Sequence, residues 1–192
     1  MKGRGFTLIE LLVTVAIVMT VLTLGVPTFE NMVRDNRLTT LANDLLGMLN
    51  LARSEAIKRG AVVSVCKSVD GMRCGGSGWS DGWIVFVNQD EDSPPVVDPG
   101  EEILRYHETL PAGYSLGANK NFLNHVSYRP NGRSNNMGRF VFCKGNKLEN
   151  HSRAIFVSIT GRARVAQDEN HNGIPDERNA DNKIVDIDRC QF

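Results

Sequence analysis

The residues best suited to chemistry in this chain are two arginines, Arg162 and Arg164, which follow Gly161. On a β-strand, residues two positions apart point to the same face and are separated by about 6.6 Å along the strand. That spacing suits adjacent phosphates, because each guanidinium offers a planar fork of donors. The pattern predicts an anion-binding surface. The alternative is a surface hairpin whose two arginines are only solvated.

The charge pattern around the pair supports the anion-binding interpretation. The chain as a whole is neutral, with 22 basic and 22 acidic residues, but Lys120–Val165 holds nine basic residues and one acid, and Asp81–Leu110 holds eight acids and one arginine. We expect Lys144, Lys147 and Arg153 to support the pair. Such a surface would bind a nucleic-acid backbone without sequence preference, and its binding would weaken with salt. Because no aromatic residues are interleaved with the basic residues, we expect contact with a duplex rather than stacking on the bases of single strands.

A second group of oxygen-bearing side chains comes later in the sequence. Asp168, Asn170, Asn172 and Asp176 occupy alternate positions with a glycine among them, as at the start of a calcium loop. The glutamate that usually stands at the twelfth position of such a loop is missing. These four residues are a candidate calcium site, and we otherwise expect no cofactor. A loop of Asx turns would explain the same pattern without a metal.

Four cysteines, Cys66, Cys74, Cys143 and Cys190, all follow residue 65. An even number on the exported side of a membrane favours disulfides, and three pairings are possible. We predict Cys66–Cys74, which closes a short glycine-rich loop, and Cys143–Cys190, which ties the tail to a central strand. A zinc site, the alternative, requires paired ligands such as C-x-x-C, and these spacings do not provide them.

Nothing in the sequence assembles an active site. The four histidines are scattered, and no H-E-x-x-H, G-x-S-x-G or phosphate-cradling glycine loop is present. We therefore expect a protein that is not an enzyme.

The N-terminal segment reads as a retained membrane helix. Lys2 and Arg4 precede Leu8–Val26, a run of nineteen residues with one charge, Glu10. The run is long enough to cross a hydrocarbon core of ~30 Å, and the basic residues favour a cytoplasmic N-terminus. No small-residue cleavage site follows it. A carboxylate in hydrocarbon costs about 2.5–3.5 kcal/mol, so Glu10 either stays near the headgroups or has a partner that the isolated chain lacks.

Two periodicities describe the remaining elements. Helical spacing continues to Lys58-Arg59-Gly60, which predicts one helix of roughly 50 residues. Its apolar stripe comprises Leu38, Leu41, Ala42, Leu45, Met48, Leu49, Ala52 and Ala56. After Gly60 the period becomes two, which predicts strands at 61–67, 82–87, 102–107, 126–129, 139–144, 154–159 and 162–166. An antiparallel sheet, or two small sheets, packed on the stripe gives an α+β fold.

Three segments carry a family resemblance. Gly5-Phe6-Thr7-Leu8-Ile9-Glu10 before an apolar helix resembles the prepilin signature of type IV pilins and type II secretion pseudopilins. Leu51–Ala56 and Asp81–Val87 resemble the GspH/FimT group of these proteins. The resemblance implies the type IV pilin fold, in which a long N-terminal helix packs on an antiparallel β-sheet head. The implied parts are a leader (1–5), a transmembrane and assembly half of the helix (6–30), its amphipathic half (31–60) and a disulfide-bonded β-rich head (61–192).

The resemblance also implies how the protein is processed. A prepilin peptidase cuts after Gly5 and methylates the new amine of Phe6, and Glu10 pairs with that amine on a neighbouring subunit. The segment Gly161-Arg162-Ala163-Arg164 resembles the Gly-Arg-x-Arg element with which FimT-type minor pilins bind DNA during natural transformation.

The function implied is that of a minor pilin. It would hold a single pass in the inner membrane with its head in the periplasm, and then enter a type IV pilus to prime assembly or bind DNA for uptake. Its expected partners are other pilin subunits, the prepilin peptidase, the inner membrane and DNA. The alternatives are a minor pseudopilin of type II secretion and a singly anchored binding protein of the envelope.

Overall fold

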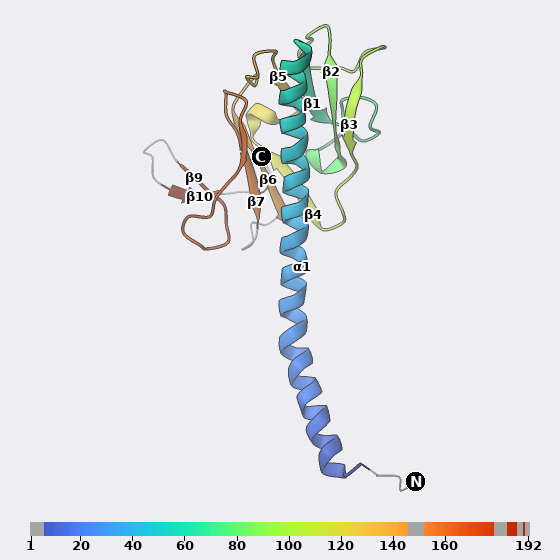
Figure 1. Cartoon of the computed structure of the whole chain (residues 1–192), viewed down its shortest axis with the longest axis vertical. Coiled ribbons are helices and arrows are strands. Elements are labelled where there is room, and N and C mark those ends of the chain that lie inside the picture. Colours follow the sequence, from blue (N-terminus) through green and yellow to red (C-terminus); the bar gives the residue numbers. More distant parts are fainter. Residues whose placement is uncertain (1–5, 146–151, 179–183, 188–189, 191–192) are drawn as a thin grey trace. The chain divides into compact units, whose positions relative to one another are not determined.

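The computed structural model describes residues 6–145, 152–178, 184–187 and 190. Its first element is a helix of 52 residues, α1 (Leu8–Arg59), in agreement with the prediction (Figure 1). Thr7 and Glu10 form a reciprocal cap at its start: the Glu10 N–H donates to Thr7 Oγ1 at 3.3 Å, and the Thr7 N–H donates to the Glu10 carboxylate at 3.5 Å. At its end Gly60 adopts a φ of 66° and donates its N–H to the Ala56 carbonyl, as the glycine there predicted.

The chain divides into two compact units, residues 1–37 and residues 38–192. In the first unit the large apolar side chains at the start of α1 are exposed, Phe6 and Leu8 among them. Among the described residues, no helix combines the length and the apolar character that crossing a membrane requires. The assignment of residues 6–30 to a transmembrane half of the helix stays a prediction.

The head, residues 38–192, is organised around the apolar stripe of α1. All eight residues of the predicted stripe are buried, from Leu38 to Ala56. They form one hydrophobic cluster with residues from both four-stranded sheets, such as Val85 of one and Phe140 of the other. The Trp83 indole N–H lies 3.1 Å from Met48 Sδ and links sheet to helix directly.

Two antiparallel four-stranded sheets cover this stripe (Figure 1). The first has the order β3-β2-β1-β5 and the second the order β4-β6-β7-β8, and a small two-stranded sheet pairs β10 with β9. The strands are β1 (Val62–Lys67), β2 (Trp83–Asn88), β3 (Ile103–His107), β4 (Tyr114–Ala118), β5 (His125–Tyr128), β6 (Gly138–Lys144), β7 (Arg153–Val157), β8 (Ala163–Val165), β9 (Asp176–Arg178) and β10 (Ile184–Asp186). Two short 3₁₀ helices, η1 (Trp79–Asp81) and η2 (Lys120–Phe122), complete the fold.

The seven predicted strands are all present, with ends shifted by one or two residues. Three further strands were not predicted. β4 contains Gly117 and Ala118, which weaken any strand signal, and it is held by its pairing with β6. β9 and β10 are three residues each, which is too short for a clear strand signal, and they pair with each other.

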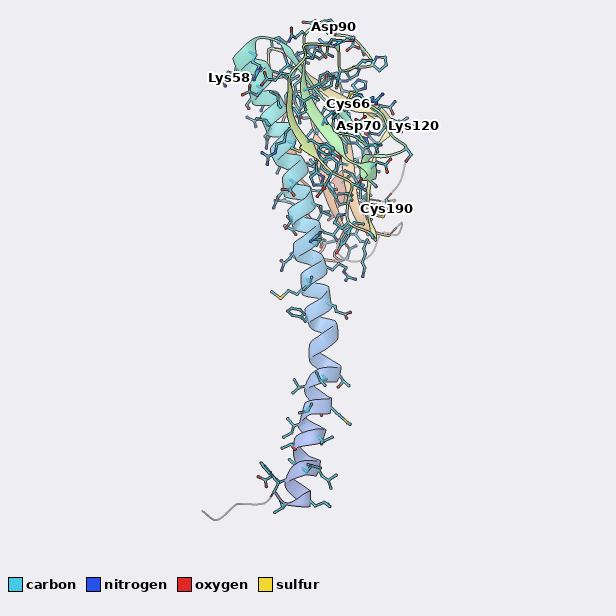
Figure 2. All side chains as sticks on the ribbon, turned by 90° about the vertical axis from the view of Figure 1, so that its right-hand side faces the viewer. Lys58, Cys66, Asp70, Asp90, Lys120 and Cys190 are labelled. Atoms are coloured by element: carbon cyan, nitrogen blue, oxygen red, sulfur yellow. A yellow bond between two sulfur atoms is a disulfide. The ribbon has the colours of Figure 1, made fainter. Side chains whose placement is uncertain are left out.

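Both predicted disulfides are confirmed. Cys66 is bonded to Cys74 and Cys143 to Cys190, and no free cysteine remains. The second bond joins the C-terminal segment to the central strand β6 of the second sheet. Figure 2 shows Cys190 well away from the end of the head where Lys58 and Asp90 lie.

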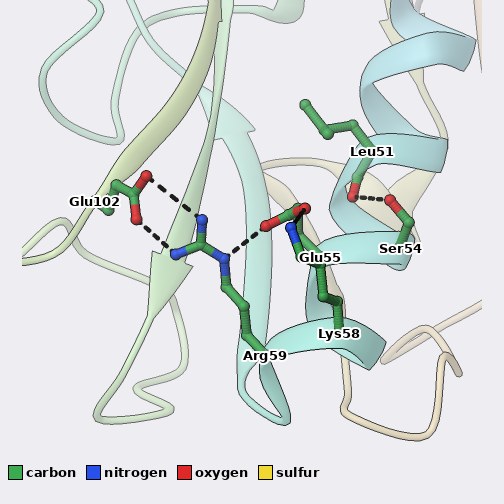
Figure 3. Close-up of polar contacts among 6 residues, drawn as sticks. All are labelled: Leu51, Ser54, Glu55, Lys58, Arg59 and Glu102. Carbon is green, nitrogen blue, oxygen red and sulfur yellow. Dashed lines mark hydrogen bonds and ion pairs between the residues drawn. The ribbon is translucent and has the colours of Figure 1, made fainter.

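An ion-pair network connects the C-terminal turn of α1 to the start of β3 (Figure 3). Arg59 donates to both carboxylate oxygens of Glu102, at 2.5 and 3.4 Å, and its Nε donates to Glu55 at 2.6 Å. The Arg59 guanidinium holds the pKa of both Glu55 and Glu102 below the ordinary value. The network therefore favours the ionised carboxylates, and it fixes the acidic side of the head to the helix end.

The depressed pKa of Glu102 gives a pH-dependent prediction. A carboxyl group with a lowered pKa in the folded state stabilises the fold above its unfolded value of 4.5, and that contribution is lost as pH falls through the folded value. We expect Glu102→Gln to lower the melting temperature at neutral pH and to have a smaller effect at acidic pH, because the wild-type group becomes protonated as the pH falls through its lowered folded pKa. Thermal unfolding followed by circular dichroism at both pH values is the measurement. Glu108→Gln, at an exposed acid outside this network, is the matched control, and an equal loss at both pH values would contradict the assignment.

Candidate nucleic-acid interface

Arg162 and Arg164 lie on the edge hairpin formed by β7 and β8. A turn closes the hairpin, with the Gly161 N–H bonded to the Ser158 carbonyl at 2.8 Å. Arg164 is paired in register with Phe156, and its guanidinium carbon lies 5.3 Å from the centre of that ring. This contact is a cation–π interaction that orients the arginine.

Both arginines are exposed and line the same hollow of about 670 Å³. Phe156 belongs to the side of β7 that packs away from α1, whereas Ile155 and Val157 belong to the cluster around the helix. The structure therefore places the two predicted residues together, on the outer face of the second sheet.

The hollow also contains charges that the sequence pattern did not indicate. Arg139 of β6 lines it and forms an ion pair with Glu177, and Glu169 and Asp176 line it too. These acids come from the segment that follows β8. The strongly basic stretch therefore does not give a uniformly basic surface here, because the fold lays an acidic segment beside it.

The two supporting bases that the structure describes, Lys144 and Arg153, do not join the pair. Lys144 lies five residues beyond Arg139 on β6, or about 17 Å along a strand. Arg153 donates from Nε to Thr39 Oγ1 of α1 at 3.3 Å, on the helix side of the sheet. Lys147 lies outside the described residues. The described part of the predicted interface is thus Arg162 and Arg164.

Gly161 has a structural role that sequence reasoning missed. It adopts a φ of 78°, and a Cβ there would lie 1.9 Å from the Gly132 carbonyl oxygen. Arg53 of α1 joins the two neighbouring turns, because its Nε donates to the Gly132 carbonyl at 3.0 Å and its Nη2 to the Thr160 carbonyl at 3.3 Å. The glycine allows this close approach, and the adjacent arginines are thereby fixed relative to the helix.

The predicted calcium residues form a compact loop. The Asp168 carboxylate accepts the N–H groups of Asn172 and Gly173, and the Asp176 carboxylate accepts those of Glu169 and Asn170. Asn170 and Asn172 each accept the N–H two residues further on, from Asn172 and Ile174, and these are the Asx turns that the alternative interpretation expected.

An acid that the sequence analysis missed completes the loop. The side-chain amides of Asn170 and Asn172 donate to Asp186 at 2.8 and 2.7 Å, and these bonds lower the pKa of Asp186. Asp168, Asn170, Asn172, Asp176 and Asp186 together present oxygen donors of the kind calcium takes. Calcium binding stays a prediction.

The assembly residues lie at the start of the chain. Phe6 is 83% exposed, and the carboxylate of Glu10 contacts the backbone of Thr7, while Gly5 lies outside the described residues. Cleavage, methylation and the pairing of Glu10 with a neighbour stay predictions. The sequence left open what stabilises the Glu10 carboxylate in an isolated chain. The cap supplies part of the answer, because the start of α1 gives Glu10 an N–H donor and a favourable dipole.

A long helix that packs its apolar stripe on antiparallel sheets defines the class of protein: it is the type IV pilin fold. The crystal structure of the type IV minor pilin FimU from Pseudomonas aeruginosa (strain PAO1) matches with a TM-score of 0.54 and 23% identity, over 71% of this chain and 92% of that one. A second crystal form of the same protein matches with a TM-score of 0.51 and 22% identity, over 67% and 92%. At this identity the likeness establishes the fold.

Two family models match the sequence itself. The model of the type II transport protein GspH covers residues 41–161, and the prokaryotic N-terminal methylation motif covers residues 1–26. A comparison with curated proteins found no significant match. The chain belongs to the GspH family and is a minor pilin or pseudopilin, which confirms the family expected from the sequence.

The close approach at Gly161 gives a stability prediction. We expect Gly161→Ala to lower the free energy of unfolding by about 1–3 kcal/mol, because an L-residue at this φ is strained and its Cβ meets the Gly132 carbonyl. Chemical denaturation is the measurement. Gly113→Ala is the matched control, since Gly113 also has a positive φ, of 85°, but open space around its Cβ position. Equal losses of unfolding free energy in the two variants would show that the positive φ alone causes the loss and that the contact with the Gly132 carbonyl does not contribute.

Proposed function

We propose that this chain is a minor pilin of a type IV pilus whose head binds DNA without sequence preference through Arg162 and Arg164. The observation that carries the proposal is the pair itself: two exposed guanidinium groups on one edge hairpin, lining one hollow. Each can donate two parallel hydrogen bonds to a phosphate. The hairpin is fixed to α1 through Arg53, so the pair is presented in a constant orientation.

The surrounding charges determine where a DNA backbone can lie. Glu169 and Glu177 line the hollow too, and Glu177 is paired with Arg139. A backbone that runs along the hairpin, past Arg162 and Arg164, meets the two exposed arginines and avoids the acidic C-terminal segment. A contact of so few charges is weak and strongly dependent on salt.

The N-terminus serves export and assembly in this proposal. A prepilin peptidase removes the leader after Gly5 and methylates Phe6, consistent with the methylation motif of the family. The helix holds the protein in the inner membrane with its head in the periplasm until it joins other pilin subunits. Glu10 then pairs with the Phe6 amine of a neighbouring subunit. In this way the protein also primes assembly of the filament.

A second candidate function is that of a minor pseudopilin in type II secretion, which the description of the GspH family favours. The same fold, processing and assembly residues would serve it. The two differ in phenotype: deletion of a minor pilin impairs piliation or DNA uptake, whereas deletion of a pseudopilin impairs secretion of exported proteins. A defect confined to secretion would replace the first proposal with the second.

The DNA-binding role predicts the effect of removing the pair. For the full-length chain in detergent micelles, we expect Arg162→Gln/Arg164→Gln to weaken DNA binding roughly 10-fold or more, and to reduce the slope of log affinity against log salt by about two. Fluorescence anisotropy with single-stranded and duplex oligonucleotides of mixed sequence is the measurement. Arg105→Gln, at an exposed arginine among the acidic residues, is the control. Unchanged binding in the double variant would remove the DNA-binding proposal.

The two roles of Glu10 can be separated by one conservative substitution. Glutamine keeps the oxygen that caps the helix but removes the charge that would pair with a neighbouring amine. We expect Glu10→Gln to leave helix content unchanged by circular dichroism and to reduce incorporation into isolated filaments at least several-fold. Glu30→Gln, further along α1, is the control. Normal incorporation of Glu10→Gln would show that no charge pairing is needed. If neither the wild type nor the variant entered filaments, that result would favour a singly anchored envelope protein.

A further inference from the structure

The hollow beside the arginine pair is larger and more apolar than a phosphate site requires. Its volume is about 670 Å³, and its lining includes Phe156, Val157, Ile159 and Met137. Met137 is a large apolar side chain that is 56% exposed in the described structure. A phosphate bound by two arginines would leave this apolar surface unused.

The hollow is lined by groups of both charges. Arg162 and Arg164 lie on the β7–β8 hairpin, whereas Glu169 and Glu177 belong to the segment after β8, and Glu177 is paired with Arg139. Two residues with amide side chains, Asn119 and Asn121, line the hollow too. Asn121 donates to the Met137 carbonyl at 2.8 Å, which leaves its amide oxygen as an acceptor at the edge of the apolar floor. A ligand that fits this arrangement has a negative part on one side and a flat, largely apolar part with polar edges beside it.

A nucleotide has this distribution of charge. Its phosphate suits Arg162 and Arg164, and its base has apolar faces and hydrogen-bonding edges that suit the rest of the lining. Arg164 already stacks on Phe156, and a base can stack in turn on the exposed guanidinium plane. Such stacking does not depend on which base is present, because every base has a π-face.

The bases of an intact duplex cannot enter the hollow, because they are paired and stacked inside the helix. Extruding one costs a few kcal/mol, and the cost is least for a base that is already single-stranded. The structure therefore supplies the apolar platform that the sequence did not indicate, and it favours an unpaired base over the duplex contact expected from sequence alone.

We infer that the hollow binds an unpaired base of single-stranded DNA while Arg162 and Arg164 hold the flanking phosphates. This inference rests on the proposed DNA-binding function and gives it a substrate class: single strands, overhangs and frayed ends in preference to blunt duplex. Met137 and the Arg164 guanidinium, which lies over Phe156, form the base platform, and the two asparagines contact the edge of the base without fixing its identity.

An oligonucleotide that lacks bases tests this inference directly. The full-length chain in detergent micelles is titrated with three labelled probes of equal length: oligo-dT, an abasic oligonucleotide with the same phosphates, and a blunt duplex. We expect oligo-dT to bind about 5- to 150-fold more tightly than the abasic strand, which corresponds to one stacked base. We also expect it to bind more tightly than the duplex. Equal affinity for oligo-dT and the abasic strand would overturn the inference and leave phosphate binding intact.

Variants separate the base platform from the phosphate contacts. We expect Met137→Ser to reduce the preference for oligo-dT over the abasic strand several-fold and to leave abasic binding unchanged. Met72→Ser is the matched control, because Met72 is 72% exposed and does not line the hollow. Arg162→Gln/Arg164→Gln should weaken binding of all three probes. If the wild type binds none of them, the proposed DNA-binding function fails; if it binds all three equally, that function stands and the base site is excluded.

Discussion

Burial of one stripe of α1 is the interaction on which the rest of the head depends. Eight apolar residues from Leu38 to Ala56 are buried from solvent in one cluster with residues of both sheets. Each Å² of apolar surface removed from water contributes about 25 cal/mol, so this burial stabilises the head. Because both sheets pack on the same stripe, their outer faces are set by it. The arginine hairpin is on an outer face for that reason, as its neighbours Ile155 and Val157 point to the helix.

The segment Gly161-Arg162-Ala163-Arg164, which suggests DNA binding, also has a role in the packing of the head. Gly161 is required where its turn meets the turn at Gly132, and Arg53 bonds to carbonyls of both turns. Arg53 belongs to the Leu51–Ala56 segment that marks the family, as does Glu55, which pairs with Arg59. The end of the helix thus holds the β3 side of the head through Arg59 and the β8 side through Arg53. Only Arg162 and Arg164 remain as the part of the motif available to a ligand.

Sequence reasoning succeeded where the signal is local or strongly periodic. The stripe of α1, its glycine end and the strands rich in Val, Ile and Phe follow from spacing and residue type, and the two disulfides followed from loop length and position. It missed β4, whose glycine and alanine carry little strand signal and whose place depends on pairing with β6. It also missed the Arg139–Glu177 pair and the role of Asp186, because those partners lie 38 and more than ten residues apart along the chain. Contacts of this kind depend on tertiary folding, which no short window of sequence contains.

The Cys143–Cys190 disulfide ties the acidic C-terminal segment to the second sheet. Cys143 and Cys190 lie in a small cluster with Val141, Ala154 and Ile187, on the outer face of β6 and β7. Phe156 packs against this cluster and also forms part of the hollow. The bond therefore helps to hold the C-terminal segment close to β6, where Glu177 pairs with Arg139. The disulfide thus influences the charge around the arginine hairpin as well as the stability of the head.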